Sequence, residues 1–203
     1  MPTTLDLRRD HGALYRAGDV PELISVPPLP CLMVDGTGDP NSTPEYADAV
    51  ATLYAVSYGL RAMAKAQGTV WTVMPLQGLW WADDPTSFVT GRREQWQWQW
   101  TMLIVQPELV TAEMVTDAVA QAVKKKKAPA ADRLRLEVLD EGDAIQVMHH
   151  GPYADEGPTI AGLHADLARR GLGFRGAHHE IYLSDPRRAA PAAMRTIIRQ
   201  PVE

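Results

Sequence analysis

The chain has 203 residues, a length that predicts one domain, or one domain built from two similar halves, and that can bury a core without disulfides or metals. Hydrophobic residues make up 45% of the sequence and charged residues 22%, which excludes a disordered tail protein. The net charge of -5, from 20 basic and 25 acidic side chains, gives nucleic acid no general electrostatic reason to bind.

The first 29 residues are predicted to form an N-terminal arm. The segment is polar at first and ends in the run PPLP at residues 27–30, which stops any regular element. A short edge segment is expected near residues 22–26. Residues 30–203 are expected to form a single domain.

The first half of that domain, about residues 30–106, opens with a strand and a helix. Residues 31–34 form a short apolar strand, closed by a run of Asp, Gly, Pro and Asn residues that turns the chain. Thr43 and Pro44 fit the N-cap and the first position of a long amphipathic helix that ends near Gln67.

Two further strands complete this half. The pattern over residues 69–81 is strand-like and ends at Asp83-Asp84-Pro85. Residues 96–102 alternate strictly with period two, which predicts a strand with three tryptophans and Met102 on one face.

A helix and a strand, within about residues 107–140, are predicted to link the two halves. Pro107 and Glu108 start the helix, which runs to the lysines at 124–127, and the strand covers residues 134–139. The lysine run is interpreted as a solvated helix end, where the helix dipole favours cations. The alternative, a nucleic-acid patch, has no basic or aromatic residues following it.

The second half, about residues 141–203, repeats the order of the first. Its strand, helix and two strands are predicted over residues 144–149, 155–170, 174–183 and 194–199. Two βαββ units predict an α+β fold, in which tandem repeats form one curved antiparallel sheet with helices on one face. The other face of the sheet is then expected to line a central ligand groove.

Period-two phasing predicts which side chains line this groove. In the strand at 174–183, Ile181 belongs to the more apolar set, which leaves Glu180 on the groove face. The same phasing puts Met148 and the tryptophans at 98 and 100 on that face. The full set of candidate ligand-binding residues is Trp71, Trp80, Trp98, Trp100, Met102, Met148, His178 and Tyr182.

Glu180 is then a carboxylate surrounded by aromatic and thioether groups. Such a site suits a flat, apolar and often cationic molecule, because each cation–aromatic contact contributes about 0.5–2 kcal/mol. The carboxylate can neutralise the charge of a ligand, or act as a general acid or base if burial raises its pKa. The alternative for Glu180 is a solvent-facing strand residue.

Two other sequence features are weaker candidates, one for a metal site and one for a phosphate-binding loop. The pairs His149-His150 and His178-His179 each offer at most one metal ligand, because adjacent strand residues point to opposite faces, so no metal site is expected. The glycine-containing run at residues 35–39 lacks the spacing of a phosphate-binding loop, and no cofactor is expected.

The sequence also predicts a compartment. Cys31 is the only cysteine, so no disulfide can form within the chain, and a reducing compartment is the simplest interpretation. No stretch approaches the ~20 apolar residues of a membrane helix, and the N-terminus has no apolar signal core. A cytoplasmic protein without membrane contact is expected.

Four segments together resemble a known family. They are MVDGTGDPN at 33–41, MPLQGLWW at 74–81, MHHGPY at 148–153 and HHEIYLSDPRR at 178–188. In this order they resemble the GyrI-like small-molecule-binding family, over about residues 30–202. The resemblance implies a tandem βαββ fold with a central groove. In multidrug-responsive regulators such a domain holds lipophilic cations with a buried Glu and aromatic residues, and Glu180 matches that Glu.

The chain departs from those regulators because no helix-turn-helix segment precedes or follows the domain, so no direct nucleic-acid binding is expected. Some stand-alone members resemble hydrolases that open the cyclopropane of DNA-alkylating natural products. In that interpretation Glu180 positions or activates water, and Tyr153 or Tyr182 polarises the departing carbonyl; the candidate catalytic residues are Glu180 and Tyr153. Three hypotheses result: a protein that sequesters small molecules, a detoxifying hydrolase, and an adaptor for a protein partner.

Overall fold

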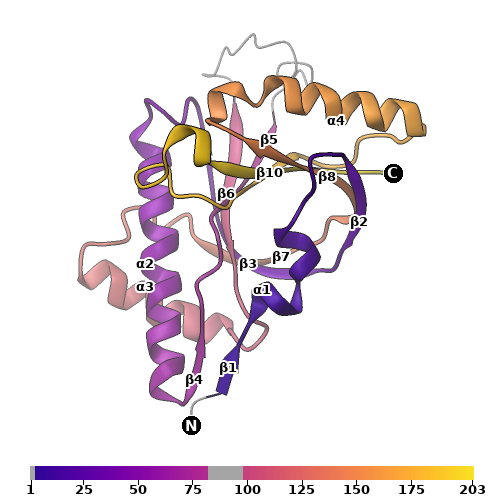
Figure 1. Ribbon diagram of the computed structural model, residues 1–203. Coiled ribbons are helices and arrows are strands. Elements are labelled where there is room, and N and C mark those ends of the chain that lie inside the picture. The colour runs from indigo at the N-terminus through magenta and orange to yellow at the C-terminus, as the bar shows by residue number, and fades with distance from the viewer. Residues whose placement is uncertain (1–2, 82–97) are drawn as a thin grey trace.

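The structure of the protein is a computed structural model that describes residues 3–81 and 98–203. These residues form four α-helices and ten strands (Figure 1). In chain order they are β1 (Thr3–Leu5), α1 (Leu7–Asp10), β2 (Glu22–Val26), β3 (Leu29–Thr37), α2 (Pro44–Ala66), β4 (Thr69–Trp71), β5 (Gln77–Trp81), β6 (Gln99–Val105), α3 (Ala112–Lys124), β7 (Arg135–Leu139), β8 (Gly142–His150), α4 (Gly157–Arg170), β9 (His178–Tyr182) and β10 (Arg195–Pro201). Short 3₁₀ helices include η1 (Gly12–Tyr15) and η4 (Tyr153–Asp155).

Eight of the strands form one curled antiparallel sheet, in the order β2-β8-β10-β9-β5-β6-β3-β7. Two units of the same order, β3-α2-β5-β6 and β8-α4-β9-β10, occupy its two halves, and their strands β5 and β9 meet at the centre. The predicted α+β fold with tandem βαββ repeats is therefore confirmed. The expected edge segment is β2, and β1 and β4 form a separate parallel pair.

Local sequence signals explain where two of the helices begin and end. α2 begins at Pro44, whose fixed φ suits the first helical position, and Thr43 is its N-cap residue. The Thr43 hydroxyl donates to the carbonyl of Asp39 at 2.8 Å instead of accepting from the first turn of the helix. α4 ends at Gly171, whose φ of 70° lies in the left-handed region that glycine adopts without steric cost.

Two predicted elements have different bounds in the structure. The strand expected over residues 69–81 is two strands, β4 and β5, because Pro75 between them has no amide donor. The helix expected from Pro107 begins only after Thr111, whose side chain accepts a hydrogen bond from the Met114 amide. Pro107 is therefore followed by a turn, and α3 begins only after that turn.

The bounds of two further strands also differ from those expected. β6 begins at Gln99, and residues 96 and 97 of the expected strand lie outside the described residues. β9 begins at His178, and Phe174 forms only an isolated bridge to Val202. The central part of both of these strands is confirmed.

Helices α2 and α4 pack on the same face of the sheet. From α2, the ring of Tyr46 stacks on Trp80 of β5. From α4, Leu163 joins an apolar cluster with Ile198 of β10. The pairing of β5 and β10 with β9 puts both contacts on the face that carries Glu180.

The N-terminal segment packs against the opposite face. β1 pairs with β4, β2 pairs with β8, and between them Leu14 and Tyr15 are buried. The Arg199 guanidinium donates to the Leu14 carbonyl at 2.8 Å, and the Gln146 amide donates to the carbonyls of Ala13 and Arg16. The segment is therefore held both by strand pairing and by side chains of β8 and β10.

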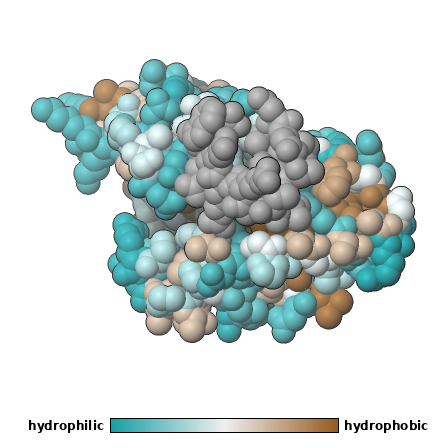
Figure 2. Space-filling view, turned by 90° about the horizontal axis from the view of Figure 1, so that it is seen from above, coloured by the Kyte–Doolittle hydropathy of each residue, from teal (hydrophilic) through white to brown (hydrophobic). Residues whose placement is uncertain are grey.

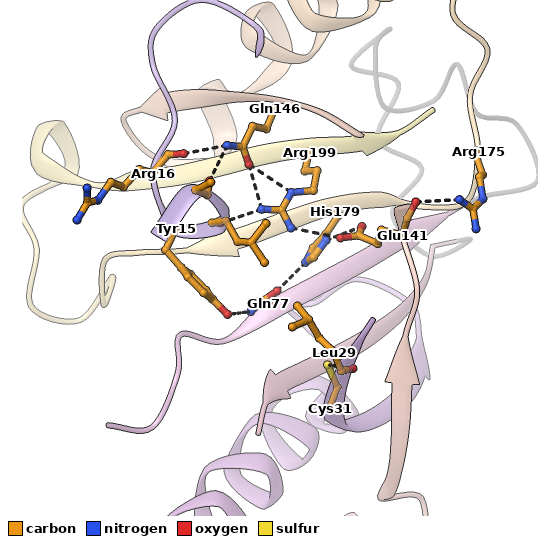
Figure 3. A network of polar contacts seen from close by, with 12 residues as sticks. Tyr15, Arg16, Leu29, Cys31, Gln77, Glu141, Gln146, Arg175, His179 and Arg199 are labelled. Atoms are coloured by element: carbon orange, nitrogen blue, oxygen red, sulfur yellow. Dashed lines mark hydrogen bonds and ion pairs between the residues drawn. The ribbon is translucent and has the colours of Figure 1, made fainter. Parts of the chain in front are cut away.

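Beneath this segment lies a buried polar network (Figure 3). Glu141 lies between Arg199, at 3.2 Å, and His179, at 2.8 Å, and the other ring nitrogen of His179 lies 2.9 Å from Gln77 Oε1. The Gln77 amide in turn donates to the Tyr15 hydroxyl. Burial alone raises the pKa of Glu141, but the charges and hydrogen bonds of His179 and Arg199 outweigh it and lower this pKa to about 2.

Large hydrophobic side chains that remain exposed lie on different elements, among them Val20, Leu23, Val138 and Phe174. In the view from above, hydrophobic atoms form separate patches among hydrophilic ones (Figure 2). Scattered exposure of this kind needs no partner to explain it. Across the described residues, none of the helices is both long and apolar enough to cross a membrane.

Candidate functional site

The centre of the sheet brings the candidate side chains onto one face. Residues paired directly across neighbouring strands share a face. The relevant pairs are Gly78 with Glu180, Trp80 with His178, Trp80 with Trp100, and Gly78 with Met102. Tyr182 follows Glu180 by two positions in β9 and therefore lies on the same face.

Aromatic rings from five different parts of the chain surround Glu180. Tyr46 is stacked with Trp80, with centroids 6.2 Å apart, and meets Trp100 edge-on at 5.5 Å. Trp80 meets Trp98 edge-on at 5.6 Å. Tyr153 meets Tyr182 edge-on at 5.3 Å. We call this set the Glu180 cluster: Tyr46, Trp80, Trp98, Trp100, Met102, Tyr153, His178, Glu180 and Tyr182.

Two glycines provide the space for the tryptophan rings. A Cβ at Gly36 would lie only 2.0 Å from the Trp100 ring, so this ring occupies the space next to the backbone of β3. A Cβ at Gly78 would lie 2.7 Å from Trp80 Nε1 and 2.9 Å from the Tyr182 hydroxyl oxygen. Side chains at these two positions are incompatible with the observed ring positions.

Hydrogen bonds fix the carboxylate of Glu180. The Tyr182 hydroxyl donates to Glu180 Oε2 at 2.9 Å, and the Trp80 indole N–H donates to the Tyr182 oxygen at 3.0 Å. His178 Nε2 lies 3.3 Å from Glu180 Oε1. The Glu180 side chain is 14% exposed. It is therefore a largely buried acceptor with a defined orientation, within reach of a molecule at the surface of the cluster.

The members of the cluster differ in exposure. Trp80, Trp100 and Met102 are buried, whereas Trp98 and Tyr153 are half-buried. The part of the cluster that reaches the surface therefore comes from the half-buried rings and from Glu180.

The tyrosines of the cluster are held neutral. Burial, and then the charges of Glu156 and Glu180, raise the pKa of Tyr153 to about 12. Burial and the charge of Glu180 also raise the pKa of Tyr182. Glu156 is a buried residue directly before α4, so a second carboxylate lies near these hydroxyls. Both phenols are thus proton donors over the whole physiological pH range.

The sequence prediction of the groove face is corrected in one respect. The Glu180 face was expected to lie opposite the helices, but α2 and α4 cover it. The reason is that both faces of the sheet are covered, one by helices and the other by the N-terminal segment, so apolar alternation does not distinguish them. Ile181, on the face opposite Glu180, is also fully buried.

Two candidate residues lie apart from the cluster. Met148 pairs with Ile197, which pairs with Ile181, so Met148 is on the face opposite Glu180. Trp71 is buried in β4, outside the eight-stranded sheet, where it pairs with Leu5. The expectation that both join the site is wrong. The eight remaining candidates do come together, and their role in binding or catalysis stays a prediction.

Sequence reasoning missed four residues near the site. Tyr46 is hidden in the amphipathic pattern of its helix, and Glu156 looks like a polar residue at the start of one. Gly36 and Gly78 gave a weak signal, since a glycine inside a strand indicates close approach of another group. The contacts of these two glycines follow only from the pairing of strands that are distant in the sequence.

Neither a metal site nor a second candidate site emerges from the described residues. Among residues 3–81 and 98–203, no three His, Cys, Asp or Glu side chains are placed to hold a metal ion. A cavity of about 180 Å³ lies beside Glu141, lined in part by Leu79, Arg175 and Pro201, and no member of the Glu180 cluster lines it. The Glu180 cluster remains the candidate site.

Comparison with known proteins identifies the family. A family model, the GyrI-like small molecule binding domain, matches residues 104–202. An uncharacterized conserved protein from Listeria innocua is 36% identical, with 98% of this chain and 100% of that chain covered and a TM-score of 0.89. The chain belongs to the GyrI-like small-molecule-binding family. The resemblance noted in the sequence is thereby confirmed.

Two other similar structures are described as hydrolases from Listeria innocua. They are 37% and 36% identical, cover 98% and 99% of this chain and 100% of their own, and have TM-scores of 0.84 and 0.86. The GyrI-like fold also occurs in the EcmrR C-terminal domain, at 13% identity and a TM-score of 0.60, over 90% of this chain and 96% of that one. No curated protein matches the chain significantly.

Proposed function

We propose that the Glu180 cluster binds planar, lipophilic and preferably cationic small molecules, and that the protein protects the cell by holding such drugs or xenobiotics. One observation carries this proposal: a largely buried carboxylate, fixed by Tyr182, lies within a wall of tryptophan and tyrosine rings. Membership of a small-molecule-binding family supports it.

Charge and flat apolar area are the two properties of this site that favour such a ligand. A cation placed over an indole or phenol face gains about 0.5–2 kcal/mol per ring, and more when water is excluded. A carboxylate at low local dielectric attracts the same cation over a short distance. Because the rings of Trp98 and Tyr153 are partly exposed, a flat ligand can cover them while its charge faces Glu180.

Titration with a cationic dye of the rhodamine type tests this function. We expect dye binding to quench tryptophan emission, because the indoles of the cluster lie at the binding surface. Glu180→Gln keeps the shape of the side chain and is expected to lower dye affinity by about 10-fold, the scale of one charge contact in a partly buried site. The matched control is Glu113→Gln on the exposed face of α3, which is expected to bind as the wild type does.

A hydrolase is the second candidate, because two similar structures are described as hydrolases. The substrate class is a cyclopropane conjugated to a carbonyl, as in DNA-alkylating natural products. Glu180 would take a proton from water as the water oxygen bonds to a cyclopropane carbon. The ring C–C bond then breaks, its electrons move to the carbonyl oxygen, and a tyrosine hydroxyl stabilises the negative charge until that oxygen is protonated.

Mass spectrometry separates the two candidates. The protein is incubated with a cyclopropane-bearing alkylator, and the small molecule is recovered. A hydrolase yields a product heavier by one water, in amounts that exceed the protein. A binder returns the unchanged compound. Glu180→Gln distinguishes enzymatic from spontaneous ring opening.

A further inference from the structure

A chain of hydrogen bonds ends on the carboxylate of Glu180. It begins at the Trp80 indole, passes through the Tyr182 hydroxyl at 3.0 Å and reaches Glu180 Oε2 at 2.9 Å. Trp80 belongs to β5 and Tyr182 to β9, so the chain crosses the seam between the two βαββ units. The hydrogen bond between Trp80 and Tyr182 lies next to Gly78, where a Cβ would clash with the Trp80 indole nitrogen and the Tyr182 oxygen. Residue 78 must therefore be a glycine.

We infer that Trp80 is a positioning residue for Glu180. Its indole N–H donates to the Tyr182 oxygen, so that the Tyr182 hydroxyl proton points to the Glu180 carboxylate. The carboxylate is thereby kept in a fixed orientation as an acceptor for a cationic ligand. This inference rests on the proposed function, since it concerns the same carboxylate. It assigns Trp80 a role beyond that of an aromatic contact.

The direction of the chain follows from the donors available. An indole N–H can only donate, so the Tyr182 oxygen must be the acceptor in its bond with Trp80. A phenol has a single proton, which then points to Glu180. Each bond polarises the next, so the indole strengthens the bond between the phenol and the carboxylate.

Other polar groups also surround Glu180. His178 lies on the same strand, at 3.3 Å. After burial, the negative charge of Glu180 raises the pKa of Tyr46 in α2 and of Tyr153 in η4. The negative charge of Glu156, before α4, also raises the pKa of Tyr153 and Tyr182. Trp80→Phe removes the indole N–H but keeps an aromatic ring next to Tyr46.

One consequence concerns the hydrolase candidate. Because the only proton of Tyr182 is directed to Glu180, this hydroxyl has none left for a substrate carbonyl. Tyr153, rather than Tyr182, is therefore the group that would stabilise the carbonyl oxygen.

The test compares four variants by dye fluorescence anisotropy, a signal that does not depend on tryptophan emission. The quantity measured is the ratio of the affinities for the rhodamine cation and for a neutral planar dye of similar size. Tyr182→Phe removes the hydrogen bond that orients the Glu180 carboxylate and is expected to lower this ratio by about 10-fold, the scale of one hydrogen bond to a charged group. Trp80→Phe should lower it by a smaller step, and the double variant no further than Tyr182→Phe alone.

Trp71→Phe is the matched control, because Trp71 is also a buried tryptophan but lies outside the Glu180 cluster. Its affinity ratio is expected to equal that of the wild type. An equal ratio for Trp80→Phe and Trp71→Phe would overturn the inference while leaving the proposed function intact. A wild type that binds neither dye would instead overturn the proposed function, and this inference with it.

A second measurement applies if Trp80→Phe does not fold. In the wild type, the Trp80 indole N–H proton is expected at low field in the NMR spectrum, because it is hydrogen-bonded. Tyr182→Phe removes its acceptor and is expected to move this resonance to higher field. A resonance that does not move would overturn the inference.

Discussion

Gln77 of β5 and His179 of β9 are hydrogen-bonded across the seam between the two βαββ units, at 2.9 Å. On the other face of the same two strands, Trp80 and Tyr182 are joined at 3.0 Å. The seam is thus held by side chains on both faces, by a buried ionic network on one and by the Glu180 cluster on the other. Substitutions in the network are expected to change stability, and those in the cluster to change binding.

Glu141 is expected to make stability depend on acid pH. Its pKa is about 2 in the folded protein, against an ordinary value of 4.5, so it stabilises the fold above pH 4.5. This contribution is lost as the pH falls from about 4.5 through about 2. Denaturant unfolding over this range should show the free energy of unfolding decreasing.

Glu141→Gln isolates this contribution. At neutral pH it removes the partner of Arg199 and His179 and is expected to lower the free energy of unfolding by about 3–5 kcal/mol, as for other broken buried pairs. Its acid dependence in the same range should be weaker than that of Glu113→Gln, an exposed control. Identical acid profiles for the two variants would show that Glu141 is not the group responsible.

Gly78→Ala is expected to displace side chains of the Glu180 cluster and to lower stability. The added Cβ would press on Trp80 and Tyr182, two large side chains in the cluster, and lower the free energy of unfolding by about 1–3 kcal/mol. It should also weaken dye binding, because the bond between Trp80 and Tyr182 cannot form. Gly162→Ala in α4 is the control: nothing lies near its Cβ, and it should stabilise the protein by about 0.5–1 kcal/mol. Equal dye affinity in both variants would contradict the geometry given for Gly78.

The tyrosines of the cluster are expected to make stability depend on alkaline pH. The pKa of Tyr153 is raised from 10 to about 12 in the folded protein, so its contribution is complete below pH 10 and lost as the pH rises through about 12. Absorbance titration should show phenolate from Tyr153 and Tyr182 only above the ordinary tyrosine pKa of 10. Tyr153→Phe should remove part of the delayed signal, and a single titration step at the ordinary pKa would contradict this.

If the protein is a hydrolase, two substitutions should differ in effect. Glu180→Gln removes the group that accepts a proton from water and is expected to lower turnover of a cyclopropane substrate by about 100-fold or more. Tyr153→Phe removes one hydroxyl and should lower turnover less, with the fold unchanged by circular dichroism. Wild-type turnover in Glu180→Gln would exclude Glu180 as the base.

Much of the fold was accessible from the sequence because each signal is local. Period-two alternation identified β6 and β9, and Pro44 and Gly171 marked the start of α2 and the end of α4. The repeated order of elements then implied the tandem βαββ sheet. The break between β4 and β5 was missed, although Pro75 stands within it.

The site was predictable only in part, because it depends on pairing between distant strands. Alternation put Glu180 and Tyr182 on one face of β9, but the phase of Met148 relative to them requires the register of β8, β10 and β9. The contact of Tyr46 with Trp80 depends on how α2 lies across the sheet. The choice of the wrong face came from Ile181, whose burial is due to the cover on the face opposite the helices.

Calorimetry with a rhodamine-type cation and a neutral planar dye of similar size, on the wild type and Glu180→Gln, measures what the Glu180 charge contributes to ligand binding. We predict that the wild type prefers the cation and that Glu180→Gln loses affinity for the cation by about 10-fold, while affinity for the neutral dye stays within about 2-fold. Equal losses for both dyes, or no loss for either, would contradict a role for the Glu180 charge in ligand binding.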